Sequence, residues 1–315
     1  MILDSQIARI IEVLNAGFPP VHTMTGAEAR AVIRSRFTPV ADPRPVAQVA
    51  DRTIAGPEGP IDVRIYRPRA ADTDAVPTLV WAHGGGWVFC DLDSHDDLCR
   101  DFANQIPAVV VSVHYRRAPE EGRWPAAAED VYAATVWAAE HITELGGDPN
   151  RLLVGGDSAG GNLAAVTALM ARDRGQPLLS GQLLLYPVIA ADFDTPSYRQ
   201  FGRGYYNPKP ALQWYWDQYV PTVADRSNPY ASPLQSTDLS GLPPAVVVIA
   251  GHDPLRDEGR AYCEALRGAD VPTVVRYFEG GVHGFMTMPS LDICHRARAQ
   301  ACASLIELLG PSVTT

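Results

Sequence analysis

The 315-residue chain is expected to fold as a single α/β domain, with a mostly parallel sheet of about eight strands flanked by helices. Two observations predict this class. From residue 78 onward, short apolar runs alternate with stretches long enough for helices, which is typical of parallel strands buried on both faces. In addition, side chains that can act as nucleophiles, acids or bases follow several of these runs, at the positions where the connecting loops of such a sheet converge.

The composition is that of an ordinary globular chain with enough apolar residues for a substantial core, because 46% of the residues are hydrophobic and 20% are charged. No Ser/Gly-rich linker, charge run or internal repeat divides the sequence, so residues 1–315 are expected to form one domain. The net charge of −10 disfavours nucleic acid and anionic membranes as partners, because both require a basic surface. A small neutral molecule remains acceptable as a partner.

The first 20 residues predict neither a signal peptide nor a membrane anchor, because Asp4, Arg9 and Glu12 interrupt their apolar residues. We therefore expect a cytoplasmic protein without stable membrane insertion. The 5 cysteines are an odd number, are widely scattered and lack Cys-x-x-Cys spacing. A disulfide framework and a zinc site are therefore disfavoured, and buried thiols are expected.

Two helices and a hairpin are expected before the parallel sheet begins. Apolar residues recur at helical spacing near the N-terminus, at Ile7, Ile10, Ile11 and Leu14. A second helix is expected over residues 27–36. Apolar and polar residues then alternate, which predicts a strand, at Ile61, Val63 and Ile65. This strand is expected to pair with residues 46–54 across the turn 56–59 as an antiparallel hairpin.

The apolar runs that follow are expected to form the parallel strands, and they are Leu79–Ala82, Ala108–Val113, Leu152–Gly155, Gln182–Tyr186, Ala245–Ala250 and Thr273–Phe278. Between residues 189 and 225 this rhythm is interrupted by a segment rich in aromatic residues. We expect this segment to form a cap element over the body of the protein. Its aromatic side chains either line a pocket for an acyl group or pack the cap against the body.

Two glycine-containing segments predict the two halves of an acyl-transfer site. Residues 156–160 read Gly-Asp-Ser-Ala-Gly, in which the flanking glycines permit a sharp turn that exposes the oxygen of Ser158 at the start of a helix. Residues 83–87 read His-Gly-Gly-Gly-Trp, and such glycines let backbone N–H groups approach a developing oxyanion. Ser158 is therefore the candidate nucleophile.

A serine nucleophile needs a general base, and chain order limits the choice of histidine. In enzymes with this serine motif the acid and then the histidine follow the serine. The histidines that follow Ser158 are His252, His283 and His295. His295 lies in the expected C-terminal helix, and His252 directly precedes the candidate acid, so its side chain is expected to point away. His283 lies in a glycine-flanked loop that can turn an imidazole inward, and it is the expected base.

The carboxylate that orients this base is expected within residues 253–259, where Asp253 and Asp257 compete for the role. Asp253 is favoured because it is nearer the strand end and because Pro254 fixes the turn after it. Asp257 and Glu258 instead look like first-turn carboxylates that stabilise the next helix through its dipole.

Other polar features are given structural roles. Residues 91–97 mix carboxylates with a histidine, which a metal could bind, but a helix-capping loop is the better explanation. His83 precedes three glycines, which favours a loop-shaping hydrogen bond over catalysis. Asp157 and Asn162 are expected to brace the turn at Ser158. Neither a metal nor a cofactor is expected.

Taken together, these motifs resemble the bacterial hormone-sensitive-lipase-like (family IV) carboxylesterases of the α/β-hydrolase fold. The similarity spans most of the chain and is carried by residues 83–87, 93–96, 115–120, 124–127, 156–162, 253–259 and 283–285. The chain departs from the family at Arg117 and Trp124, where the family often has leucine and phenylalanine. Neither departure lies among the three candidate catalytic residues.

The resemblance carries expectations about the site and the architecture. It implies a catalytic triad, made up of Ser158, Asp253 and His283. It implies an oxyanion hole built from the N–H groups of Gly84, Gly85 and Ala159. It also implies a helical cap at the N-terminus, over residues 1–45, and frequent homodimers.

The leading hypothesis is a carboxylic ester hydrolase that forms an acyl-enzyme on Ser158 and acts on small-molecule esters with short to medium acyl groups. The same machinery suits an amidase or arylacetamide deacetylase, and this alternative stays open. A third hypothesis is a non-catalytic small-molecule receptor built on a disabled hydrolase. It is disfavoured because His283 is present, whereas the plant gibberellin receptors that this family resembles lack the catalytic histidine.

Overall fold

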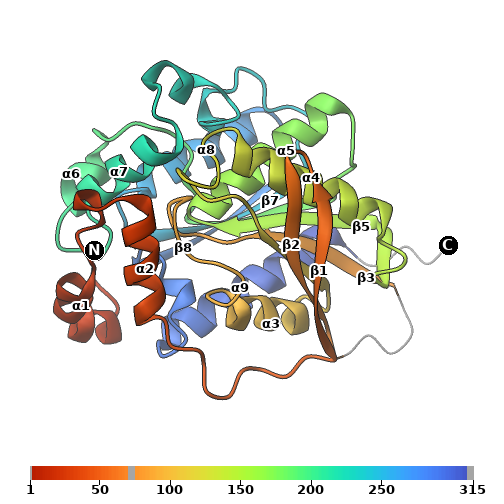
Figure 1. Cartoon of the computed structure of the whole chain (residues 1–315), viewed down its shortest axis with the longest axis horizontal. Coiled ribbons are helices and arrows are strands. Elements are labelled where there is room, and N and C mark those ends of the chain that lie inside the picture. The colour runs from red at the N-terminus through yellow and green to blue at the C-terminus, as the bar shows by residue number, and fades with distance from the viewer. Residues whose placement is uncertain (1, 70–74, 311–315) are drawn as a thin grey trace.

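The computed structural model describes residues 2–69 and 75–310, and its eight strands form one sheet in the order β1-β2-β4-β3-β5-β6-β7-β8 (Figure 1). The predicted N-terminal hairpin consists of β1 (Gln48–Gly56) and β2 (Gly59–Arg67). β2 also pairs antiparallel with β4 (Val109–His114). The other described pairs are parallel and involve β3 (Val76–Ala82), β5 (Gly147–Asp157), β6 (Gly181–Leu185), β7 (Ala245–His252) and β8 (Thr273–Val282). The predicted fold class is therefore confirmed, and each predicted apolar run lies on a strand.

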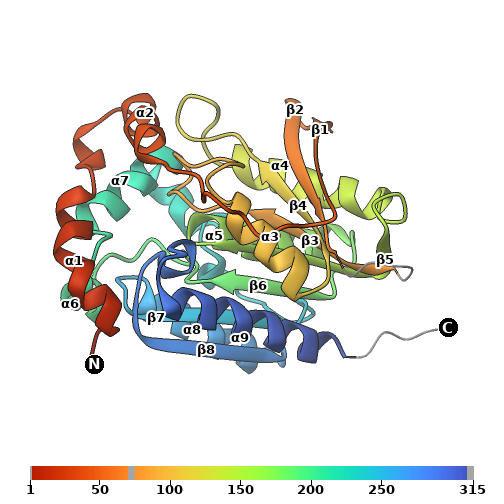
Figure 2. The same cartoon turned by 90° about the horizontal axis from the view of Figure 1, so that it is seen from below.

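Helices cover both faces of this sheet (Figure 2). One face is covered by α3 (Asp96–Gln105) and α9 (Asp292–Leu309), which contact each other. The other face is covered by α4 (Ala126–Glu140), α5 (Ala159–Arg174) and α8 (Arg256–Gly268). Alternate residues of β7 show the result, because Val246 packs in the cluster with α9 while Val247 packs in the cluster with α5 and α8. The central strands are apolar throughout for this reason.

The two edges of the sheet differ from its centre. In β2 the predicted alternation is present, because Ile61, Val63 and Ile65 are buried while Asp62 is exposed. In β8 the residues from 273 to 276 are only half-buried. An edge strand lacks a neighbour on one side, so the run that predicted β8 is less buried than the other parallel strands.

Four helices gather at one end of the molecule (Figure 2). They are α1 (Ser5–Gly17), α2 (Gly26–Arg36), α6 (Pro196–Phe201) and α7 (Lys209–Tyr219). α2 begins with a capping box, in which Thr25 and Glu28 satisfy each other's backbone N–H groups. The side chain of Asn15 on α1 connects the N-terminal helices to the loop between α6 and α7, because it donates to the Gly204 carbonyl and accepts from the Tyr206 N–H.

Short 3-10 turns complete the described elements, at Val21–Thr23, Val223–Ser227, Pro233–Gln235 and Phe285–Thr287. Within the described ranges, every helix is too short or too polar for a membrane-spanning segment. All five cysteines are free thiols; four are buried and Cys90 is half-buried.

Candidate active site

Three side chains from three loops meet at the carboxyl ends of parallel strands. Ser158 follows β5, Asp253 follows β7 and His283 follows β8 directly. Nε2 of His283 lies 2.8 Å from Oγ of Ser158, and Nδ1 lies 2.8 Å from Oδ2 of Asp253. Because a carboxylate only accepts hydrogen bonds, Nδ1 carries a hydrogen and Nε2 is left to accept from the serine hydroxyl. The structure thus brings together the three residues that the sequence singled out.

These groups are shielded from solvent to different degrees. Asp253 is 0% exposed, while Ser158 is 8% exposed and His283 is 7% exposed. The carboxylate is therefore enclosed, and the serine and the imidazole keep a small open edge. The backbone N–H of Leu255 donates to the second oxygen of Asp253 at 2.9 Å, which fixes the direction of the carboxylate.

The turn at Ser158 is strained, as its motif predicts. Its φ of 56° and ψ of −117° are rare for a residue with a side chain and cost about 1–3 kcal/mol. Two hydrogen bonds hold this conformation, from the Ser158 N–H to the Leu185 carbonyl at 2.9 Å and from the Val188 N–H to the Ser158 carbonyl at 3.1 Å. Gly160 is required because a Cβ there would collide with the backbone of Ala82.

The competing acids and histidines have other partners. Asp257 accepts from the Ser197 N–H at 2.8 Å. Nδ1 of His252 lies 2.8 Å from the Glu279 carbonyl, and Nε2 of His295 lies 2.8 Å from the Pro289 carbonyl. Nδ1 of His252 is thus engaged by the backbone of β8, and His295 lies on α9.

Glu258 has a role that the sequence did not indicate. It was expected to stabilise the start of α8, but its side chain is buried and Oε1 accepts from the Ile189 N–H at 2.7 Å. Burial raises the pKa of Glu258 well above its ordinary value of 4.5, and the negative charges of Asp253 and Asp192 add to the rise. Glu258 thus braces the start of the segment 189–225.

One of the predicted oxyanion donors is already engaged in the structure. It lies in the glycine loop, residues 83–87. The N–H of Gly84 donates to Oδ1 of Asp157 at 2.9 Å, so its hydrogen is already used and Gly84 does not serve as an oxyanion donor. Within the described part of the chain, no protein acceptor receives the N–H groups of Gly85, Gly86 or Ala159. Ala159 is the first residue of α5, where backbone N–H groups lack partners within the helix.

Backbone conformation and close packing explain why residues 85 and 86 of this loop are glycines. Gly85 has a φ of 111° and Gly86 a φ of 59°, in the region that glycine adopts without strain. The carbonyl of Gly85 accepts from the N–H groups of Val88 and Phe89, both at 3.0 Å, which closes a tight turn. A Cβ at Gly86 would lie 2.5 Å from the ring of Tyr215 on α7.

His83 shapes the loop in the way the sequence predicted. Its Nδ1 donates to the Gly84 carbonyl at 2.7 Å, and its ring stacks on Tyr115 at 4.3 Å between centroids. Complete burial holds the pKa of His83 well below its ordinary value of 6.5, and the neighbouring His95 adds to this shift. The ring is therefore neutral near pH 7.

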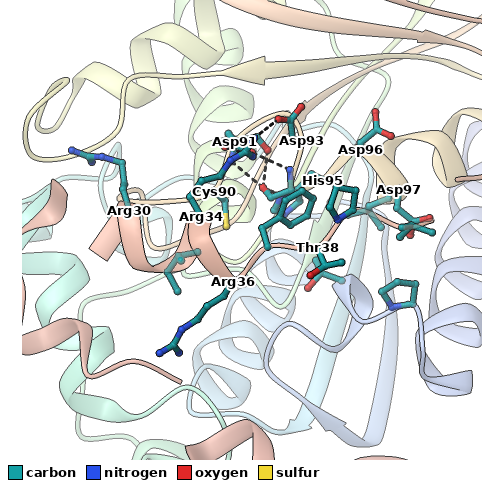
Figure 3. A pocket seen from close by; sticks show the side chains of 18 of the residues that line it. Arg30, Arg34, Arg36, Thr38, Cys90, Asp91, Asp93, His95, Asp96 and Asp97 are labelled. Carbon is teal, nitrogen blue, oxygen red and sulfur yellow. Dashed lines mark hydrogen bonds and ion pairs between the residues drawn. The ribbon is translucent and has the colours of Figure 1, made fainter. Parts of the chain in front are cut away.

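Residues 91–95 form a turn before α3, but the capping expected of residues 91–97 is not seen, because the N-cap residue His95 makes no side-chain capping hydrogen bond and Asp96 and Asp97 belong to the helix. The hydroxyl of Ser94 accepts from the Asp91 N–H at 2.9 Å, and the Asp91 carboxylate accepts from the Ser94 N–H at 3.0 Å. Arg34 on α2 reaches across to this loop and pairs with Asp91 at 3.0 Å and Asp93 at 2.7 Å (Figure 3). Nowhere in residues 2–69 or 75–310 are three or more His, Cys, Asp or Glu side chains grouped to hold a metal ion.

A cavity of about 1420 Å³ lies between α1, α2 and the body (Figure 3). Among the described residues, its lining does not include Ser158, Asp253 or His283. Cys90 lines the cavity, and its Cβ would lie 3.0 Å from a Cβ at Gly85. Tyr206 and Thr287 also line it, and a Cβ at Gly284 would lie about 4 Å from both. Residues of the cavity wall are thus neighbours of Gly85 and Gly284.

Two arginines hold the backbone between this cavity and the glycine loop. Arg30 on α2 donates to the carbonyls of Val88 and Ala118, both at 3.0 Å, and pairs with Glu120. Arg117 donates to the carbonyl of Cys90 at 3.0 Å. The sequence did not indicate that Arg30 or Arg117 binds these backbone carbonyls. In the sequence, Arg117 differs only from the residue that the resembled family often has at this position.

Comparisons with known proteins agree with this geometry. A family model described as alpha/beta hydrolase fold matches residues 79–287. The chain is 44% identical over 266 residues to the carboxylic ester hydrolase LipN of Mycobacterium tuberculosis, a match covering 82% of this chain and 70% of LipN. It is 35% identical over 302 residues to an ethyl acetate hydrolase of Pseudomonas putida, a match covering 92% and 94% of the two chains.

Solved structures give the same result. A serine-to-alanine variant of LAE6, an alpha/beta hydrolase enzyme from the metagenome of Lake Arreo, matches with a TM-score of 0.92 at 36% identity, over 98% of this chain and 99% of LAE6. A hyperthermophilic esterase from the archaeon Pyrobaculum calidifontis matches with a TM-score of 0.90 at 38% identity, over 98% and 100% of the two chains. The chain therefore belongs to the α/β-hydrolase fold family, among its hormone-sensitive-lipase-like carboxylesterases, and is an ester hydrolase.

Proposed function

We propose that the chain hydrolyses carboxylic esters through an acyl-enzyme on Ser158, with His283 as general base and Asp253 as its orienting acid. The observation that carries this proposal is the position of the His283 ring, which lies 2.8 Å from the serine oxygen on one side and 2.8 Å from the carboxylate on the other. A serine hydroxyl is unreactive without such a base, and the base needs a partner that fixes its tautomer.

The reaction proceeds in two halves. Oγ of Ser158 attacks the ester carbonyl while Nε2 of His283 takes the hydroxyl proton, and the imidazolium is held by Asp253. The same proton then passes to the leaving alkoxide, which departs as the alcohol and leaves an acyl ester on Ser158. In the second half His283 takes a proton from water, the hydroxide attacks the acyl carbon, and the returned proton restores the serine as the acid leaves.

Each half passes through a tetrahedral intermediate with a negatively charged oxygen. We assign its stabilisation to the N–H groups of Gly85, Gly86 and Ala159, because the Gly84 hydrogen is taken by Asp157. Ala159 contributes the positive end of α5 as well as its own N–H. Loss of one such donor costs about 2.7–4 kcal/mol of transition-state stabilisation.

The size of the substrate is proposed from the cavity and from one relative. The ethyl acetate hydrolase of Pseudomonas putida is named for an ester with a short acyl group. The cavity of about 1420 Å³ has wall residues next to Gly85 and Gly284, and we propose that it receives part of the substrate. We therefore propose esters with short to medium acyl groups, and an activity profile across p-nitrophenyl esters of increasing acyl length measures the limit.

The architecture around the site is part of the same proposal. We propose that residues 1–45 and about 189–225 together cap a single α/β-hydrolase domain, because their helices gather at one end of the molecule and Tyr215 on α7 lies against Gly86 of the glycine loop. The homodimer and the cytoplasmic location stay predictions from the sequence. Size-exclusion chromatography with light scattering measures the first, and fractionation of the source cells measures the second.

The direct test replaces the nucleophile. Ser158→Ala is expected to lower kcat for p-nitrophenyl acetate by at least about 10³-fold, because the oxyanion hole and binding alone supply only the residual rate. Ser180→Ala is the control, because that hydroxyl donates to the Asn150 carbonyl far from the site and its removal is expected to leave kcat unchanged. Undiminished turnover by Ser158→Ala contradicts the proposal. A faster rate on a matched anilide than on the ester favours the amidase alternative.

A further inference from the structure

Three buried groups meet at one carboxylate oxygen beside the nucleophile. Oδ1 of Asp157 lies 2.9 Å from the Gly84 nitrogen and 3.0 Å from Nε2 of His95. The two nitrogens are 3.4 Å apart, and His95 and Asp157 are each 4% exposed. The Gly84 N–H donates to this oxygen and also, at the longer distance, toward Nε2 of His95, while Nε2 lies within ion-pair distance of the same oxygen. The oxygen therefore links the first glycine of the loop to the residue that precedes Ser158.

The other ring nitrogen of His95 is also fixed. Nδ1 lies 3.0 Å from Oγ of Ser94, and the same hydroxyl holds the turn of residues 91–94 through its contacts with the backbone of Asp91. His95 is in addition the N-cap residue of α3. The imidazole therefore cannot turn away from Asp157 without breaking this turn.

This junction bears on the oxyanion hole through peptide geometry. The carbonyl of Gly84 and the N–H of Gly85 belong to one planar peptide unit and point in opposite directions. The Gly84 carbonyl accepts from His83 at 2.7 Å, and the Gly84 N–H is held by Asp157. Both polar groups of Gly84 are thus engaged, and together they set the direction in which the Gly85 N–H points.

We infer that His95 is a positioning residue for the oxyanion hole: it fixes the Asp157 carboxylate, which fixes Gly84 and hence the first free amide, that of Gly85. This inference rests on the proposed function and deepens it. His95 does not touch the reacting atoms, so its effect is expected where the charge on the oxygen develops, in kcat and in affinity for mimics of the tetrahedral intermediate. The affinity for the ground-state ester is expected to change little.

Two substitutions of His95 distinguish the contact made by Nε2 from the contact made by Nδ1. His95→Gln places an amide donor near the position of Nε2 and keeps the contact with Asp157. His95→Asn places its amide near the position of Nδ1, so it keeps the contact with Ser94 but is too short to reach Asp157. A displacement of about 1 Å costs roughly 10²-fold in rate, and we expect His95→Asn to lower kcat for p-nitrophenyl acetate by about that factor.

Inhibition by a transition-state analogue tests the positioning role, because a loss of structural support alone would not selectively weaken the affinity for this inhibitor. We expect His95→Asn to weaken inhibition by a trifluoromethyl ketone roughly 10²-fold while KM for the ester stays within about threefold of wild type. His95→Gln is expected to remain within about fivefold of wild type in both measurements, as rescue by the variant that keeps the contact. Melting temperatures establish that both variants are folded, and Asp157→Ala takes the place of His95→Asn if the latter does not fold.

The outcomes separate this inference from the proposed function. Wild-type kcat and inhibitor affinity in His95→Asn, or equal losses in both His95 variants, contradict the positioning role. Full activity of Ser158→Ala instead contradicts the proposed function itself. His141→Asn is the matched control, because that imidazole lies at the end of α4, where it contacts the Trp137 carbonyl and ring, and its replacement is expected to leave both measurements unchanged.

Discussion

The ring of Tyr215 packs against the α-carbon of Gly86, so closely that a Cβ there would lie 2.5 Å from the ring. The α7 helix of the proposed cap thus forms one wall of the loop that carries the proposed oxyanion donors. Phe89, three residues further along, also contacts Tyr215, at 5.6 Å between ring centroids. The position of the loop therefore depends on the cap as well as on the sheet.

Replacement of Gly86 tests this contact. Gly86→Ala is expected to displace the loop and lower kcat about 10²-fold, because small misplacements of catalytic groups have effects of that size. The double variant Gly86→Ala/Tyr215→Leu is expected to recover part of the loss, since the colliding ring is gone. Steady-state kinetics on p-nitrophenyl acetate measures both, and wild-type kcat in the single variant contradicts the account.

Arg117 is expected to contribute to stability through the carbonyl of Cys90. Arg117→Leu removes a charged donor from a half-buried carbonyl, and we expect the free energy of unfolding to fall by about 1.5–3 kcal/mol. Arg52→Leu is the comparison, because its ion pair with Glu144 is exposed and is expected to contribute about 0–1 kcal/mol. Urea denaturation measures both, and equal effects in the two variants contradict the role assigned to Arg117.

Arg30 is expected to hold the N-terminal helices on the body. Arg30→Met removes the bonds to Val88 and Ala118 and the pair with Glu120, so thermolysin is expected to cut the segment before β1 roughly tenfold faster. Arg34→Met on the same helix removes only contacts of a half-exposed side chain and is expected to have a smaller effect. Equal cleavage rates in the two variants would show that Arg30 has no special role.

Glu258 predicts how stability depends on pH. Its pKa is raised in the folded protein, so above pH 4.5 the folded state holds a proton that the unfolded state has lost, and its contribution to stability falls as pH rises. The slope is about 1.4 kcal/mol per pH unit up to the raised pKa. Glu258→Gln keeps an acceptor for the Ile189 N–H without this titration. Thermal melts are expected to show the variant gaining on wild type from pH 5 to pH 8, and parallel pH profiles contradict this.

The sequence could place the three candidate catalytic residues near one another because each lies directly after a strand. Parallel strands deliver their carboxyl ends to one edge of the sheet, so a run of apolar residues followed by a reactive side chain is enough to place that side chain near the others. Ser158 and His283 could be found in this way. Asp253 could be separated from Asp257 because only the former lies immediately after its strand.

The contacts that hold the site could not be predicted in the same way. The partner of the Gly84 N–H is decided by where Asp157 and His95 lie in space, and glycine patterns do not indicate the direction of an amide. Arg30 and Glu258 act on backbone groups that are distant in sequence and have no residue signature. Such contacts depend on how the cap and the body pack.

The central claim is that His283 and Asp253 make the hydroxyl of Ser158 reactive. Intact-mass spectrometry after reaction with a p-nitrophenyl phosphonate tests it most directly, followed by mapping of the modified peptide. We predict one phosphonyl group per chain, located on Ser158, with no adduct on Ser158→Ala and labelling slowed by at least about 10³-fold in His283→Ala. Labelling at wild-type rate in either variant, or an adduct on another residue, would contradict it.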